Sequence, residues 1–92
     1  MMPEASPEER YHEQPELERR MAAGEVSIGA AVREIRQRFL GLTLEEYASM
    51  CGISKNTLRG IELDDEAATL KSLFKALSPL GYRLALVETP DA

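Results

Sequence analysis

The stretch Leu42–Glu62, LTLEEYASMCGISKNTLRGIE, decides the fold because it carries the start and stop signals of two short helices. Thr43 predicts the start of the first helix, and Glu46 three residues later completes a Ser/Thr-x-x-Glu capping box. Gly52 predicts the end of that helix, because a left-handed residue is least costly without a Cβ atom. Ser54 is a favourable N-cap for the next helix. The stretch therefore predicts two helices joined by a tight glycine turn.

The spacing of the apolar residues indicates which faces of these helices are buried. Leu44, Tyr47 and Ala48 fall on one face of the first helix, and Leu58 and Ile61 anchor the second. This pattern is typical of a helix-turn-helix whose second helix is presented to DNA. The opposite, exposed face of the second helix carries Lys55, Asn56, Arg59 and Gly60.

The same stretch resembles the helix-turn-helix of the Xre/Cro/phage-repressor family, whose usual form is L-T-Q-E-E-L-A-x-x-x-G-[IV]-S-x-x-T-[IL]-x-x-[IL]-E. The residues that match in register are Leu42, Thr43, Glu45, Glu46, Ala48, Gly52, Ile53, Ser54, Thr57, Leu58, Ile61 and Glu62. A looser resemblance runs from about residue 28 to residue 87. Over that span the chain is most similar to HipB-type antitoxins, including TLKSLFKALSPLGYRLAL at residues 69–86. The resemblance implies a lambda-repressor-like helical bundle.

The exposed residues of the second helix suit the chemistry of DNA. Lys55 and Arg59 can approach guanine O6/N7 or phosphates, and Asn56 can pair with the N6/N7 edge of adenine. Backbone N–H groups at the helix starts of Thr43 and Ser54 can hold phosphates. The candidate DNA-binding residues are Thr43, Ser54, Lys55, Asn56, Thr57, Arg59 and Arg38.

Two residues depart from the pattern of the family. Leu44 stands where the family usually has a glutamine that contacts the DNA backbone. Gly60 stands where relatives often have a polar side chain that reads a base, and a glycine there costs roughly 1 kcal/mol of helix stability relative to alanine. Either the DNA site is read over fewer bases, or Gly60 permits a close approach.

The resemblance also implies structural roles for Arg36 and Glu62, as a partly buried ion pair, and for Gly52 at the turn. The family places its arginine six positions before the capping threonine, whereas Arg36 lies seven before Thr43. The loop at residues 39–42 is therefore expected to be one residue longer than usual. Gln37 or Arg38 are alternative partners for Glu62.

The N-terminal quarter is predicted to be separate from the DNA-binding domain at residues 26–80. Residues 1–25 are acidic and are expected to be a flexible tail, with a possible short helix at residues 15–23 that Pro15 would open. The first helix of the domain is expected over residues 27–39. Its inner stripe is predicted to consist of Ile28, Ala31, Val32 and Ile35.

Residues 81–92 are predicted to be a dimerisation strand followed by the C-terminus. A helix capped by Thr69 should end near Ser78, because the ring of Pro79 clashes with the preceding turn. The next residues alternate as in a strand, and the sequence contains no second strand candidate. A lone strand leaves its hydrogen bonds unmade, so a homodimer with an intermolecular sheet is expected. The candidate dimerisation residues are Tyr82, Leu84, Leu86 and Val87.

Composition limits the remaining possibilities. The chain has 92 residues, a net charge of −5, one histidine and one cysteine. Residues 26–63 nevertheless carry five basic and four acidic side chains, so the acidity lies outside the candidate DNA-reading region. His12 and Cys51 lack partners for a metal site or a nucleophile–base pair, so no metal, cofactor, small-molecule substrate or enzymatic activity is expected. The absence of a long apolar run predicts no membrane span, and a cytoplasmic location is the simplest interpretation.

The resemblance implies a transcriptional repressor that acts as a HipB-like antitoxin. Such a protein represses its own toxin–antitoxin operon through pseudo-palindromic double-stranded DNA and binds a HipA-like kinase toxin. One alternative is a free-standing or prophage repressor without a toxin. A second is an interaction module that neutralises a partner without binding DNA, an option that Leu44, Gly60 and the overall acidity keep open.

Overall fold

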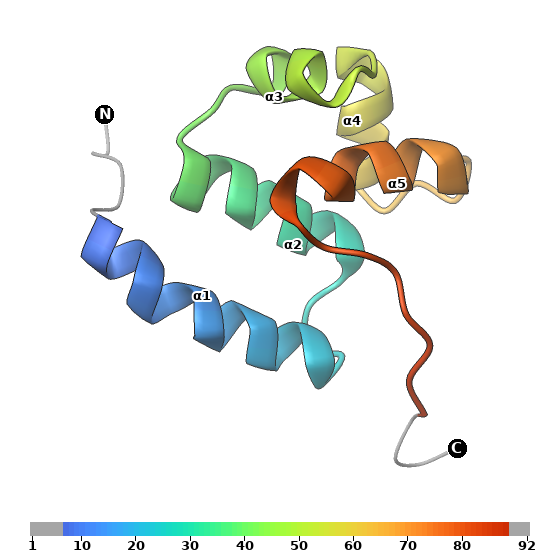
Figure 1. The fold of residues 1–92 in the computed structure, drawn as a ribbon. Coiled ribbons are helices and arrows are strands. Elements are labelled where there is room, and N and C mark those ends of the chain that lie inside the picture. The colour runs from blue at the N-terminus through green and yellow to red at the C-terminus, as the bar shows by residue number, and fades with distance from the viewer. Residues whose placement is uncertain (1–6, 89–92) are drawn as a thin grey trace.

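A computed structural model of the chain describes the backbone of residues 7–88 and the side chains of residues 15–88. The fold is mainly helical, as predicted, and no β-strand occurs within these residues. In chain order the elements are α1 (Pro7–Ala22), α2 (Ile28–Glu34), the π-helix η1 (Ile35–Leu40), α3 (Leu44–Cys51), α4 (Lys55–Glu62), α5 (Leu70–Leu77) and the 3-10 turn η2 (Ser78–Leu80). Figure 1 shows α1 beside α2, with α3, α4 and α5 grouped on the other side of α2.

The main hydrophobic core lies where α2, α3, α4 and α5 meet. Tyr47 and Leu58 are fully buried there, and the Tyr47 hydroxyl donates a hydrogen bond to the backbone oxygen of Ala76. This bond satisfies the one polar atom that the tyrosine brings into the core. Burial raises the pKa of the nearby Cys51 thiol above its ordinary value. Cys51 is therefore a small core residue rather than a reactive thiol.

The N-terminal segment is a long helix, which corrects the prediction of a flexible tail at residues 1–25. The helix begins eight residues before the predicted helix at residues 15–23, and Pro15 lies inside it instead of opening it. Residues 1–6, which also belong to the predicted tail, lie outside the described part of the chain.

A second hydrophobic cluster attaches α1 to the rest of the molecule. Leu17 is fully buried against Ile35 and Phe39 of η1. At the edge of this cluster the Tyr82 hydroxyl donates a hydrogen bond of 3.1 Å to Glu18 Oε1. Burial of a leucine side chain contributes about 1.5–3 kcal/mol to the stability of the fold. The residues that bury Leu17 lie far from it in the sequence, so the local sequence pattern does not predict this contact.

The predicted helix over residues 27–39 is divided into an α-helical and a π-helical part. At its end the Gly41 N–H donates to the oxygen of Arg36, five residues back, rather than four. A π-turn accommodates one additional residue within a helix. The π-helix runs to Leu40, so the segment between the helices covers residues 41–43 instead of the predicted loop at residues 39–42. An extra residue between Arg36 and Thr43, which the family resemblance implies, can thus be accommodated inside the helix.

Several apolar side chains stay exposed although they follow helical spacing. Ile28, predicted to lie on the inner stripe, is 46% exposed. On α5, Ala76 and Leu77 are buried, whereas Leu70 and Phe74 are 63% and 53% exposed. The outer face of α5 therefore has an apolar surface that the single chain does not cover.

The chain after α5 leaves the bundle. Thr69 caps the helix, with its Oγ1 accepting from the Ser72 N–H at 3.1 Å, and Pro79 lies in the short turn η2. Tyr82 and Leu84 still pack against the core, and residues 85–88 then extend away from the helices; none of residues 82–88 forms a strand (Figure 1). The predicted strand at residues 82–87 is thus not formed within one chain, where it has no partner for its backbone hydrogen bonds. Residues 89–92 lie outside the described part.

Candidate nucleic-acid interface

Thr43 and Glu46 form the predicted capping box at the start of α3. Thr43 Oγ1 accepts from the Glu46 N–H at 3.1 Å, and Glu46 Oε1 accepts from the Thr43 N–H at 2.9 Å. The backbone hydrogen bond from Thr43, supported by its side chain, lowers the pKa of the Glu46 carboxyl below its ordinary value. These reciprocal bonds begin α3 at a defined residue.

The turn between α3 and α4 has the geometry that its sequence predicts. Gly52 adopts a φ of 74°, and the Ile53 N–H donates to the oxygen of Ala48 at 3.1 Å, which closes the end of α3. Ser54 Oγ then accepts from the Thr57 N–H at 3.0 Å, and its hydroxyl donates to Thr57 Oγ1 at 2.8 Å. The side chains of Ser54 and Thr57 therefore position the start of α4.

The helix α4 has one buried and one exposed face. Leu58 and Ile61 are almost completely buried in the main core. Lys55, Asn56 and Arg59 are exposed on the other side. An α-helix with a buried anchor and exposed cationic and amide groups is suited to entering the major groove of DNA.

A buried ion pair fixes α4 against the preceding helix. Arg36 Nε and NH2 donate to the two carboxylate oxygens of Glu62 at 2.7 and 2.9 Å, and Arg36 NH1 donates to the oxygen of Leu42 at 2.9 Å. Both charged residues are less than a tenth exposed. Arg36, rather than Gln37 or Arg38, is thus the partner of Glu62. Such a bidentate arrangement sets orientation as well as distance.

The candidate base-reading residues differ in how they are engaged. Lys55 Nζ lies 3.0 Å from Glu45 Oε1, in an exposed ion pair. An exposed pair of this kind contributes at most about 1 kcal/mol, so a phosphate can take the place of Glu45. Asn56 and Arg59 form no hydrogen bond or ion pair with any other described side chain. They are available to a ligand without breaking an internal contact.

The two departures from the family pattern have different structural causes. Leu44 is half-buried and packs against the main core, so its side chain serves packing in this protein. Gly60 lies beside Asp65, and a Cβ atom added to it would be 3.7 Å from Asp65 Cβ, an ordinary van der Waals distance. The fold therefore has room for a Cβ atom at this position.

Asp64 has a role that the sequence interpretation missed. Its carboxylate accepts from the Ser27 hydroxyl at 2.6 Å and from the Gly29 N–H at 2.8 Å, which joins the end of α4 to the start of α2. Asp64 also has a φ of 57°, which few residues other than glycine and aspartate or asparagine adopt. The position of an aspartate two residues after the end of α4 was the available signal, but its distant partners have no local signature.

The other predicted site residues lie in separate places. Thr43 is exposed at the start of α3. Arg38 is exposed on η1, a different helix from α4. Leu86 and Val87 are exposed beyond the bundle. His12 lies in α1, and its side chain is not among those that the structure describes. Among the described side chains, no group of three His, Cys, Asp or Glu residues is arranged to hold a metal ion.

A comparison with known protein families identifies the family to which this helix-turn-helix belongs. The sequence model of the helix-turn-helix family matches residues 32–87, more than half of the chain. The chain therefore belongs to this family, of the Xre/lambda-repressor-like type, and is a DNA-binding transcriptional regulator. No curated protein and no solved structure matches it. No helix in the described residues has the length and apolar character needed to cross a membrane.

Proposed function

We propose that the protein is a repressor that binds a pseudo-palindromic operator as a homodimer, with α4 of each copy in the major groove. The observation that carries this proposal is the free, exposed pair Asn56 and Arg59 on a helix whose orientation is set by Arg36 and Glu62. Two copies would contact half-sites about 34–36 Å apart, or a multiple of that distance.

The exposed apolar surface after α4 supports the homodimer. Leu86 is fully exposed, Val87 is three-quarters exposed, and Phe74 of α5 is more than half exposed. A groove that Phe74, Tyr82 and Leu84 help to line separates α5 from the C-terminal segment. A second copy would cover this surface and pair the two C-terminal segments as strands, which satisfies their backbone groups and removes apolar area from water.

The antitoxin role rests on the HipB resemblance of residues 69–86. In this proposal the protein represses its own operon in the cytoplasm and binds a HipA-like kinase toxin. The identity of the neighbouring gene tests the assignment. A kinase-like neighbour that copurifies with the protein supports an antitoxin, whereas a solitary gene favours a free-standing repressor.

DNA binding is tested by fluorescence anisotropy with the DNA upstream of the gene and with a random duplex of equal length. We expect preference for the upstream DNA, with an affinity that falls steeply between about 50 and 200 mM salt. Arg59→Ala should weaken binding about fivefold or more. Arg19→Ala removes the same charge from α1, on the far side of α2 (Figure 1), and should have little effect. Equal affinity for both duplexes would favour an interaction module.

A further inference from the structure

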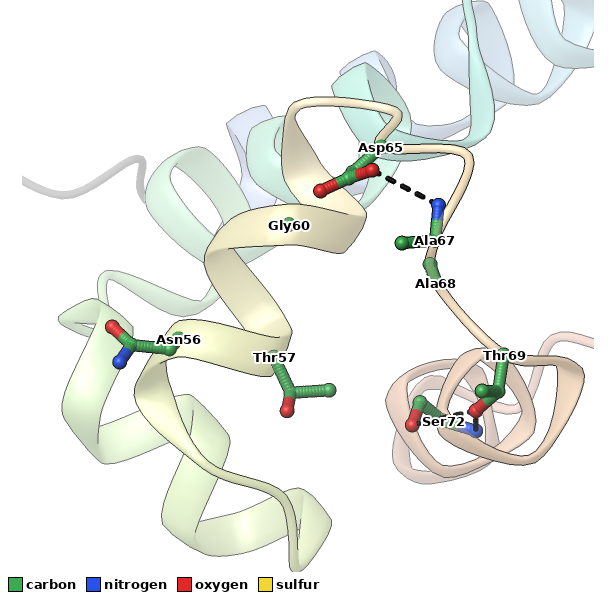
Figure 2. Close-up of a pocket in the computed structure, with 8 residues that line it drawn as sticks. All are labelled: Asn56, Thr57, Gly60, Asp65, Ala67, Ala68, Thr69 and Ser72. Carbon is green, nitrogen blue, oxygen red and sulfur yellow. Dashed lines mark hydrogen bonds between the residues drawn. The ribbon is translucent and has the colours of Figure 1, made fainter.

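A hollow of about 190 Å³ lies beside the exposed face of α4, between this helix and the start of α5. Figure 2 shows Thr57 and Gly60 on the α4 side, Thr69 and Ser72 on the α5 side and Asp65 at one end, while the Asn56 side chain points away from Thr69 and Ser72. Gly60 lies four residues after Asn56, about one turn further along α4, so the hollow lies next to the exposed face that carries Asn56.

The carboxylate of Asp65 stands beside the position that a side chain at residue 60 would occupy. Its Oδ2 lies 3.8 Å from the place of a Cβ atom on Gly60, while its Oδ1 accepts from the Ala67 N–H at 2.9 Å. The bond to Ala67 fixes the carboxylate (Figure 2), and Oδ2 forms no hydrogen bond with another described residue. The absence of a side chain on Gly60 leaves this oxygen open to the hollow.

The charge of the hollow restricts its ligand. Asp65 is the only charged residue among those that line it, and no lysine or arginine is present to hold a phosphate. A ligand must therefore bring a hydrogen-bond donor. In the major groove guanine, adenine and thymine each present an acceptor, whereas cytosine presents only its N4 amino group. Adenine also presents its N6 amino group, but the N7 acceptor beside that group repels a carboxylate, so a carboxylate favours cytosine over the other three bases.

We infer that Asp65 is a specificity-determining residue, which accepts a hydrogen bond from the N4 amino group of a cytosine that enters the hollow left by Gly60. The inference rests on the proposed DNA binding. It specifies which base, cytosine, is selected next to the C-terminal end of α4. Asp65 thereby supplies the base contact that a polar side chain at residue 60 would otherwise make.

The test is base preference, measured by selection of bound duplexes from a library randomised around the upstream DNA site. The wild-type protein should prefer cytosine at one position of each half-site. Asp65→Asn keeps an acceptor for the Ala67 N–H but turns the atom that faces the hollow from an acceptor into an N–H donor, so it should lower the preference for cytosine at that position by about fivefold or more. Gly60→Ala, whose Cβ the fold accommodates, should weaken the cytosine preference while Asp65 remains.

Glu66→Gln is the matched control, because it removes the same charge from an exposed residue outside the hollow. It should raise affinity for all sequences without altering preference. If Asp65→Asn behaves in the same way, the inference is overturned while the proposed repressor stands. The inference is also overturned, with the proposed repressor still standing, if Asp65→Asn weakens binding to a protein partner and leaves the base preference unchanged. A wild-type protein without any sequence preference overturns the proposed function and this inference together.

Discussion

Arg36 and Glu62 are joined by two parallel hydrogen bonds, of 2.7 and 2.9 Å, across the interior of the molecule. Arg36 lies in the first turn of the π-helix η1, and Glu62 is the last residue of α4. The third donor of the guanidinium holds the oxygen of Leu42, directly before α3. One side chain therefore fixes all three elements that position the helix presented to DNA.

Removing one member of this pair leaves the other charge buried and unpaired. Glu62→Ala should lower the free energy of unfolding by about 3–5 kcal/mol, as measured by urea denaturation followed by circular dichroism. Glu45→Ala removes an exposed carboxylate from an exposed ion pair and should cost less than about 1 kcal/mol. A Glu62→Ala protein with unchanged stability would show that the pair does not hold the domain together.

Gly29 and Gly60 provide a matched pair of glycine substitutions with opposite expected signs. An added Cβ atom on Gly29 would lie 2.2 Å from the backbone oxygen of Ile61, so the contact between α2 and α4 must open. Gly29→Ala should therefore destabilise the protein by about 1–3 kcal/mol. Gly60→Ala meets no close atom and should stabilise it by up to about 1 kcal/mol. Thermal unfolding of both variants checks the prediction, which fails if Gly29→Ala is as stable as the wild type.

The capping box should make stability depend on pH through Glu46. Its pKa is lowered in the folded protein from 4.5, so the ionised form stabilises the fold at pH values above 4.5. This contribution should decrease as the pH falls through the lowered pKa. Glu46→Gln can still cap but carries no charge, so the stability difference from the wild type should be largest near neutral pH and shrink in acid. A constant difference from pH 7 to about pH 3 would contradict this mechanism.

Dimerisation through the C-terminal segment can be tested without disturbing the core. Leu86 is fully exposed in the single chain, so Leu86→Asp should leave the monomer fold intact. In a dimer it places a charge in an apolar interface, and light scattering should detect a monomer. Ala85→Asp introduces the same charge on the opposite side of the predicted strand and should remain dimeric. A dimer that persists in Leu86→Asp would refute pairing through this segment.

The sequence predicts the helix-turn-helix well because its signals are local. Thr43, Glu46, Gly52 and Ser54 act on backbone groups within a few residues, and the structure has each of these contacts. The exposed face of α4 follows from the same spacing. Most of the candidate interface was therefore accessible from one short stretch.

The parts that the sequence did not predict depend on distant contacts. Leu17 is buried by residues of η1, and Asp64 is bound by Ser27 and Gly29, more than thirty residues away. Asp65 was overlooked for a similar reason, because its position beside Gly60 depends on the path of the loop that follows α4. Local periodicity contains no information about such partners.

The π-helix has a consequence for how this chain is compared with its relatives. By the spacing that the resemblance implies, this chain has one residue more than the family between Arg36 and Thr43. With that residue placed in the π-helix, an alignment that puts the gap in the following loop would shift residues 37–40 by one position. One position corresponds to a rotation of about 100° around a helix axis. Such an alignment would match the family position of Arg38, a candidate DNA-binding residue, to an adjacent residue of this chain that points in a different direction. Only a gap placed between Arg36 and Leu40 keeps the buried pair and the helix start at Thr43 in register with the family at once.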